Sequence, residues 1–444
     1  CDGVRCDMAM LMLNAAAKVD VVQHDAFGGQ GLQDAAQVAR RCDDDDGVGR
    51  HPGKHLSQED GLLARAGGKR LLHDAFRRNP VGFQDRPQDS AFGLAPAALT
   101  GIHLPSLIGR AQAMENACAA RAEENPGALL AAWIADAHGA GRDKLTLAFS
   151  PRLAPLGLWI EQLVAESLGK NGIGVVPVIE HAPAADPGYD DDRAIVVTRF
   201  TDDEQLAAWS RGLAGEYPVF ELTLTDVFDL GAEFVRWEYA TALAGFLLGV
   251  NPFDEPNVTE AKHATTAILE GGAHEVPGAQ VDADGTWVTF AGALSAPTPL
   301  PADRKSALRT AIRAAGPLDY IAVLAYLPED EARLRPLTDA VAHATRATGR
   351  AITLSLGPRY LHSTGQLHKG GRNSGVFVLV TTRDRTDREI PGKHFTLSAL
   401  HRAQAEGDLV TLTRHDRRVL RLDLPSADVA EIERLAADII EATR

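Results

Sequence analysis

The chain has 444 residues, of which 45% are hydrophobic and 24% charged, proportions typical of a globular protein rather than a disordered or fibrous one. Its length exceeds that of one small module and predicts two or three packed units. The formal net charge of −15 argues against a nucleic-acid partner, because phosphate backbones are held chiefly by basic surfaces.

The cysteines and the apolar segments indicate where in the cell the protein is expected to work. The four cysteines lie within the first 118 residues without zinc-type spacing, and we expect them to be reduced thiols. No run reaches the roughly 20 apolar residues of a membrane span. The apolar stretch 8–17 is too short and too close to acidic residues for a signal peptide. We therefore expect a cytoplasmic protein with no membrane partner, and the initial Cys1 suggests a fragment of something longer.

Residues 1–90 differ in composition from the rest of the chain. They contain no Ile, Thr, Trp or Tyr, whereas the later part is rich in Ile, Val and Thr. A stable α/β layer needs β-branched runs, and here only 19–22 resembles one. This segment is therefore expected to be an atypical part of the chain, poorly ordered or helical, or read out of its proper coding phase.

From residue 91 onward, helical and strand patterns alternate. Helices are expected at 111–122, 126–140, 158–168, 203–213 and 230–250, with strands at 144–149, 174–179, 194–200 and 219–224. The next helix is expected to open with a capping box formed by Asn257 and Glu260. Strands that are apolar throughout and alternate with helices predict a doubly wound parallel sheet with helices on both faces.

A second alternation follows the Pro-rich stretch 296–302. Strands are expected at 320–326, 351–356, 376–382 and 419–424, with helices at 331–348, 397–407 and 427–443. We therefore expect an α/β domain over 91–296 and a C-terminal α/β unit over 297–444.

Two short segments carry candidate functional residues in the first domain. Glu166 and Lys170 lie in AESLGK, where a helix ends before a strand, and a carboxylate at such a place can serve as a general base. Lys262 follows the two-proline turn NPFDEP, in a helical turn where the helix dipole does not favour a cation. Solvated surface side chains remain the alternative for each of these residues.

The most distinctive segment is 357–375, between two strong strands. Its glycines let backbone amides approach a ligand, and its hydroxyls, amides and cations suit a phosphorylated sugar. The phosphate loop of the nucleotide hydrolases is absent, as are an HExxH zinc motif and a GxSxG elbow. We therefore expect no metal site, and a ligand site or a purely structural loop remain open for 357–375.

Several segments together resemble the glucose-6-phosphate isomerase part of the fused bacterial transaldolase/glucose-6-phosphate isomerase proteins. They are FGLAPAALTGI (92–102), ENPG (124–127), DKLTLAFSPRL (143–153), LWIEQLVAESLGKNGIGVVPV (158–178), DLGAEFVRWEYATALAGFLLGVNPFDEPNV (229–258) and GPRYLHSTGQLHKGG (357–371). The resemblance implies a sugar-isomerase-type α/β fold. It also implies cofactor-free interconversion of glucose 6-phosphate and fructose 6-phosphate through an enediolate.

The resemblance also implies roles for individual residues. Glu166 would transfer the proton between C1 and C2, His362 of HSTGQ would open the ring, and Lys262 would lie near the ring oxygen or the phosphate. His362 follows Lys262 along the chain, whereas the family places its histidine before the lysine. The further substrate-binding candidates are Arg86, Lys170, Ser363, Thr364, Gln366 and Lys369.

The first ninety residues depart from the family, because they lack its Gly-Gly-Ser phosphate loop and SGTT cluster. Arg86 is the nearest equivalent of the family's enediolate-stabilising arginine, without the flanking GGRYS motif. A non-catalytic sugar-phosphate-binding module, an inactive remnant and an interaction scaffold for a transaldolase partner therefore remain alternatives to the isomerase. The expected partners are a sugar phosphate substrate and either a second copy of the chain or a transaldolase domain.

Overall fold

The computed structural model describes residues 94, 97–181, 183–271, 279–283, 285–294, 296–383 and 387–444. The expectation of a poorly ordered or helical segment over 1–90 falls outside these residues. The chain divides into two compact units, Cys1–Arg110 and Ala111–Arg444. In the described part of the first unit, Leu94, Ala97, Ala98 and Leu104 form a small apolar cluster.

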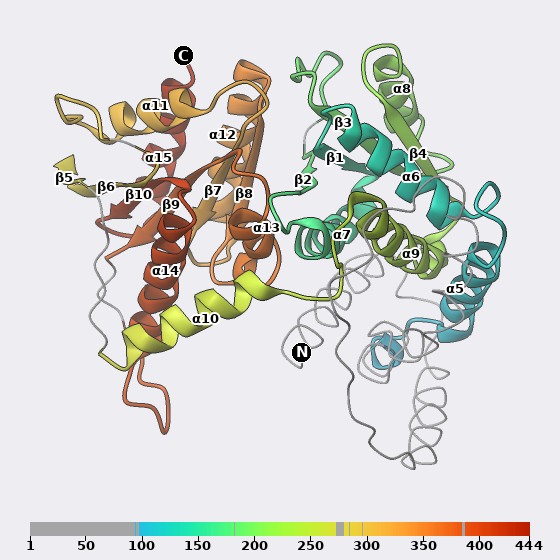
Figure 1. The fold of residues 1–444 in the computed structure, drawn as a ribbon, viewed down its shortest axis with the longest axis horizontal. Coiled ribbons are helices and arrows are strands. Elements are labelled where there is room, and N and C mark those ends of the chain that lie inside the picture. Colours follow the sequence, from blue (N-terminus) through green and yellow to red (C-terminus); the bar gives the residue numbers. More distant parts are fainter. Residues whose placement is uncertain are drawn as a thin grey trace, which may run out of the picture. The chain divides into compact units, whose positions relative to one another are not determined.

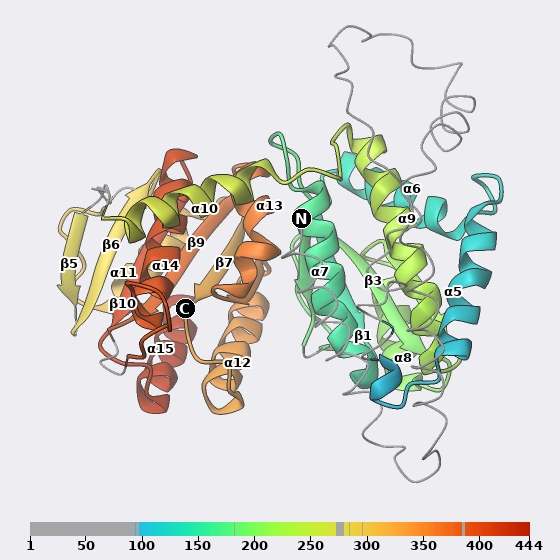
Figure 2. The same ribbon diagram turned by 90° about the horizontal axis from the view of Figure 1, so that it is seen from below.

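The second unit begins within α5 (Leu104–Cys118) and contains two sheets, drawn in Figures 1 and 2. The first sheet has four parallel strands in the order β2-β1-β3-β4. These strands are β1 (Lys144–Phe149), β2 (Val176–Ile179), β3 (Arg193–Phe200) and β4 (Val219–Leu224). All six residues of β1 are buried, as a central strand covered by helices on both faces requires.

The helices around this sheet are α6 (Pro126–Gly139), α7 (Ala154–Leu168), α8 (Glu204–Leu213) and α9 (Leu230–Leu248). Two short 3₁₀ turns, η2 (Pro151–Leu153) and η3 (Val227–Asp229), precede α7 and α9. Trp159 of α7 and Phe234 of α9 pack edge to face, with their ring centroids 5.0 Å apart. Gly127 permits the close contact of α6 with α9, because a Cβ there would lie 2.7 Å from the Cβ of Tyr239.

The second sheet has six strands in the order β5-β6-β10-β9-β7-β8. They are β5 (Ala279–Ala283), β6 (Thr286–Gly292), β7 (Tyr320–Ala325), β8 (Ala351–Leu356), β9 (Gly375–Thr382) and β10 (Arg418–Leu424). Strands β7 to β10 pair in parallel, whereas β5 and β6 form an antiparallel hairpin at the β10 edge. This hairpin precedes residue 297, the expected start of the C-terminal unit.

Helices cover both faces of the second sheet as well. One face packs against α11 (Arg304–Ala314), α12 (Glu331–Thr348) and α15 (Val429–Ala442). The other face carries η4 (Arg359–His362), α13 (Gly365–Gly370) and α14 (Leu397–Arg414). The apolar cluster on that second face also includes Ala165, Val176 and Val178, so α7 and β2 pack against it.

Several helix boundaries differ from those expected: α5 spans Leu104–Cys118 rather than 111–122, and α14 extends to Arg414 rather than to 407. Helix α9 ends at Leu248, because Gly249 takes a left-handed conformation with φ +74°. Helix α10 (Pro256–Leu269) begins with Pro256, and Glu255 is its N-cap, so the expected Asn257–Glu260 capping box is wrong. Gln366 supplies the acceptor for the Asn257 backbone N–H at 3.0 Å, and Glu260 instead faces His415.

None of the helices in the described ranges combines the length and apolar character that a bilayer crossing requires.

Candidate functional site

Gln366 connects segments that are far apart in the sequence. Its side chain is fully buried, and its Nε2 donates hydrogen bonds to the carbonyl oxygen of Gly169 at 3.1 Å and to Oδ1 of Asn257 at 2.8 Å. Its Oε1 accepts from the Asn257 backbone N–H. One amide therefore holds AESLGK at the end of α7, the start of α10 and the HSTGQ segment against one another.

Glu166 lies beside this junction, in the last turn of α7, and its carboxyl group is close to that of Glu255. Burial, followed by the hydrogen bond and negative charge of Glu255, raises the pKa of Glu166 to about 8, although Gln162 and Lys170 act in the opposite direction. Gln162 Nε2 lies 3.5 Å from Glu166 Oε2. The Glu166–Glu255 pair therefore retains a proton near neutral pH, which suits a group that must both release and accept one.

Lys170 is buried, and its ammonium group binds other residues of the chain. Nζ donates to the carbonyl oxygens of Asn251, at 2.7 Å, and Asp254, and it lies 3.0 Å from the Asp254 carboxylate. These contacts hold the two-proline turn against the end of α7. Lys170 therefore binds the same turn that carries Glu255.

His362, Ser363 and Thr364 follow β8 on the segment that ends at Gln366. His362 is half-buried at the end of η4, whereas Ser363 and Thr364 are buried. Ser363 Oγ donates to the carbonyl oxygen of Tyr360 at 3.4 Å. The Thr364 hydroxyl has no hydrogen-bond partner among the residues that the structure describes.

Lys369 lies in an internal polar network. Its Nζ is 2.5 Å from Oδ1 of Asp408 and donates to the carbonyl oxygen of Gly365 at 3.2 Å. The Tyr360 hydroxyl donates a hydrogen bond to the other Asp408 oxygen at 2.7 Å. All three side chains are nearly inaccessible to solvent, so this network stabilises the base of the 357–371 segment.

Two sequence-predicted residues remain, Lys262 and Arg86. Lys262 is exposed on α10, and Arg86 lies outside the described residues. The described residues contain no group of three or more His, Cys, Asp or Glu side chains arranged to hold a metal ion.

Sequence reasoning missed three acidic residues. Glu255 faces Glu166, Asp408 faces Lys369, and burial raises the pKa of Glu161 on α7 to about 7, against the lowering effect of Arg359. The only sequence signal for Glu255 is its place in the two-proline turn. Nothing local distinguishes Glu161 or Asp408 from other acidic residues on helices.

Comparisons with known proteins give partial matches, and no family model matches the chain. A probable glucose-6-phosphate isomerase of Methanococcus maripaludis is 26% identical over 238 residues, 45% of this chain and 52% of the relative. The glucose-6-phosphate isomerase of Synechococcus sp. CC9902 is 31% identical over 219 residues, 41% of each chain. That of Citrifermentans bemidjiense is 29% identical over 252 residues, 47% of each chain.

Among solved structures, a glucose-6-phosphate isomerase from Chlamydia trachomatis matches 76% of this chain and 72% of its own, at 12% identity and a TM-score of 0.27. A TM-score this low carries no argument about the fold. The chain spans between 41% and 52% of the length of the curated relatives named above. Over that part of its length, this chain is similar to proteins named glucose-6-phosphate isomerase.

Proposed function

We propose that this chain is a sugar-phosphate aldose–ketose isomerase that interconverts glucose 6-phosphate and fructose 6-phosphate, as the isomerase part of a transaldolase/isomerase fusion. The observation that carries the proposal is the Gln366 junction. Its hydrogen bonds to Gly169 and Asn257 join the three segments that resemble an isomerase site. The partial similarity to proteins named glucose-6-phosphate isomerase supports the same reaction class.

In this proposal Glu166 transfers the proton. Its carboxylate removes the proton from C2 of the open aldose, the electron pair forms the enediolate, and the same carboxyl group returns the proton to C1 as the carbonyl moves to C2. Matching proton exchange to O1 and O2 completes the isomerisation without a redox cofactor. A pKa of about 8 supports the role, because proton transfer is most effective when the catalytic pKa lies near the working pH.

The other side chains bind, open the ring or position the substrate. His362 would assist ring opening, and the exposed Lys262 would lie near the ring oxygen or the phosphate. Ser363 and Thr364 would offer hydroxyls to the sugar, and the Thr364 hydroxyl lacks a partner in the described part of the chain. Arg86 would stabilise the enediolate.

We do not expect direct substrate contacts from three of the candidate residues, Lys170, Gln366 and Lys369. Their polar atoms already bind Asp254, Gly169 and Asp408, respectively. They would therefore act as positioning residues that hold the site segments in place. The Glu166–Glu255 pair would then receive its geometry from Lys170, through the two-proline turn.

The test is turnover of fructose 6-phosphate by the purified chain in an assay coupled to oxidation of glucose 6-phosphate. Glu166→Gln should abolish turnover, because the amide cannot accept the proton. Glu433→Gln is the matched control, because Glu433 is exposed on α15, and it should retain full activity. Equal turnover by the wild-type and Glu166→Gln chains would remove Glu166 from the mechanism.

A second candidate function is a non-catalytic sugar-phosphate-binding module. The observation that favours it is that two buried lysines of the candidate site, Lys170 and Lys369, are engaged by the chain's own carboxylates and not left for a phosphate. Calorimetry with 6-phosphogluconate separates the two functions. Binding without turnover supports the module, and turnover supports the isomerase.

A further inference from the structure

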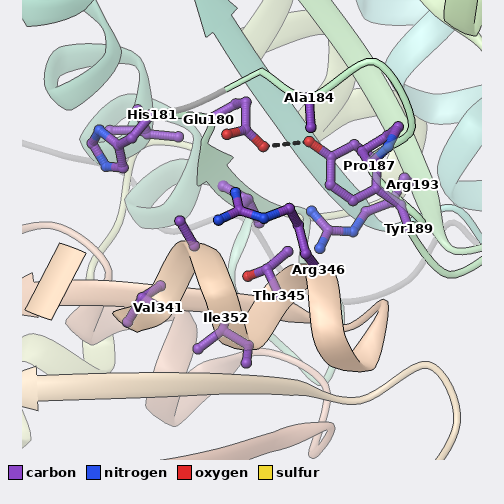
Figure 3. A pocket seen from close by; sticks show the side chains of 13 residues that line it. Glu180, His181, Ala184, Pro187, Tyr189, Arg193, Val341, Thr345, Arg346 and Ile352 are labelled. Carbon is purple, nitrogen blue, oxygen red and sulfur yellow. Dashed lines mark hydrogen bonds between the residues drawn. The ribbon is translucent and has the colours of Figure 1, made fainter. Parts of the chain in front are cut away.

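A pocket lies away from the Gln366 junction, between the end of β2 and helix α12. Its cavity volume is about 30 Å³. Glu180 and His181 follow β2, Arg193 begins β3, and Thr345 and Arg346 come from α12 (Figure 3). None of the residues that line it belongs to the proposed isomerase site.

Arg193 is the central feature of this pocket. Its side chain is fully buried, its Nη1 donates to Thr146 Oγ1 at 2.9 Å, and its guanidinium lies 4.6 Å from the centre of the Tyr189 ring. Its Nε and Nη2 have no hydrogen-bond partner among the residues that the structure describes. A buried guanidinium N–H group without an acceptor lowers the free energy of unfolding, so a ligand that supplies an acceptor would be stabilised here.

The neighbouring carboxylates do not provide that acceptor. Asp192 Oδ2 forms an ion pair with Lys144 Nζ at 3.2 Å. Asp192 Oδ1 lies 3.8 Å from Arg193 Nε, which is too long for a hydrogen bond. Glu180 accepts a hydrogen bond from the hydroxyl group of Tyr189. Glu180, Asp190 and Asp192 therefore balance the charge of Arg193 electrostatically without satisfying its free N–H groups.

A second cation reaches the same pocket from the opposite wall. Arg346 is exposed at the mouth, and its side chain forms no hydrogen bond or ion pair with any residue in the described ranges. Figure 3 shows the Arg193 and Arg346 side chains extending into the pocket from β3 and from α12. Two guanidinium groups in one recess, one of them with unused donors, form a fork suited to the oxygens of an anion.

We propose that this pocket binds a small oxyanion, a carboxylate or phosphate group, whose oxygens accept hydrogen bonds from Arg193 and Arg346. The buried Arg193 supplies donors fixed by Thr146 and Tyr189, and Arg346 closes over the ligand from α12. The site is independent of the isomerase reaction proposed above.

Isothermal titration calorimetry on the purified chain tests this site, with inorganic phosphate and with malonate as probes at constant ionic strength near neutral pH. Arg346→Gln should weaken binding about tenfold or more, because a charge-assisted hydrogen bond is lost. Arg335→Gln, exposed on the same helix and outside the pocket, is the matched control and should bind as the wild type does. Binding of phosphate alone assigns a phosphoryl ligand, and binding of malonate alone assigns a carboxylate.

Arg193→Met provides the second variant, since it keeps the length of the side chain and removes the donors. A folded Arg193→Met chain, judged by an unchanged circular dichroism spectrum, should lose the same binding event. Phosphate binding that Arg346→Gln leaves unchanged belongs to another site, such as the one proposed for the isomerase, and overturns the proposal. Absence of binding for both probes overturns it as well, with Arg193 then satisfied by water alone.

Discussion

Gln366 Nε2 donates a hydrogen bond to the carbonyl oxygen of Gly169 at 3.1 Å, although the two residues are 197 positions apart in the sequence. The same amide group binds both the side chain and the backbone of Asn257. Three segments that sequence analysis treats as separate motifs therefore share one buried hydrogen-bonding group. This junction fixes where Glu166, at the end of α7, lies relative to the segment that carries His362.

Replacement of Gln366 tests the importance of the junction for folding. Gln366→Ala removes the partners of a buried carbonyl oxygen and of the Asn257 amide groups, and each unsatisfied buried group costs about 1–3 kcal/mol. We expect the free energy of unfolding, measured by urea denaturation, to fall by roughly 2–4 kcal/mol. Gln112→Ala, which removes an exposed amide that donates a hydrogen bond to Glu115, is the control. Similar losses in the two variants would mean that the junction contributes no special stability.

Much of the fold follows from local patterns in the sequence. Strands β1, β4 and β8 have the predicted boundaries, because a buried parallel strand is an apolar run that ends where polar or turn residues begin. Sequence analysis does not predict the β5–β6 hairpin or α11. Strand β6 joins the second sheet through β10, more than a hundred residues later, and such long-range pairing leaves no local signal.

The candidate site is less readily predicted than the fold. A carboxylate in AESLGK is a visible candidate, but the pKa of Glu166 depends on Glu255, which a different segment supplies. Likewise, Lys170 of AESLGK forms an ion pair with Asp254, and Lys369 forms one with Asp408. In each case the partner that decides the side chain's role is distant in sequence and is brought near only by the packed fold.

The raised pKa of Glu166 predicts a pH-dependent stability. In the folded chain the pKa of Glu166 is about 8, above its ordinary value of 4.5, so the native state binds more protons than the unfolded state between these values. The stabilising contribution of the proton is complete below about pH 4.5 and is lost as the pH rises toward 8. Glu166→Gln lacks this proton equilibrium, so the wild type should lose stability relative to the variant as the pH increases.

Urea denaturation of both chains at several pH values between mildly acidic and mildly alkaline conditions measures this difference. Glu255→Gln should reduce the pH dependence, because it removes the negative charge that helps to raise the pKa of Glu166. Glu433→Gln should run parallel to the wild type at every pH. A constant difference between wild type and Glu166→Gln would show that Glu166 titrates alike in the folded and unfolded states.

Lys170 and Lys262 should separate stability from activity. Lys170→Met leaves the carbonyl oxygens of Asn251 and Asp254 without their charged donor, and should lower the free energy of unfolding by about 1–3 kcal/mol. Lys262→Met changes an exposed side chain and should leave the denaturation midpoint nearly unchanged, while the proposed function predicts a loss of turnover. The two measurements are urea denaturation and the coupled assay. A larger loss of stability in Lys262→Met than in Lys170→Met would contradict both assignments.

The Lys369–Asp408 pair should contribute to stability very differently from an exposed ion pair. Lys369→Met leaves the Asp408 carboxylate buried with only the Tyr360 hydroxyl, which should cost about 3–5 kcal/mol. Lys305→Met, which breaks a 2.8 Å pair with Glu441 at the surface, is the matched control and should change the urea midpoint little. The double variant Lys369→Met with Asp408→Leu should be less destabilised than the sum of its single variants, since neither charge is then left alone in the interior. Strictly additive losses would mean that the two charges do not stabilise each other in the folded chain.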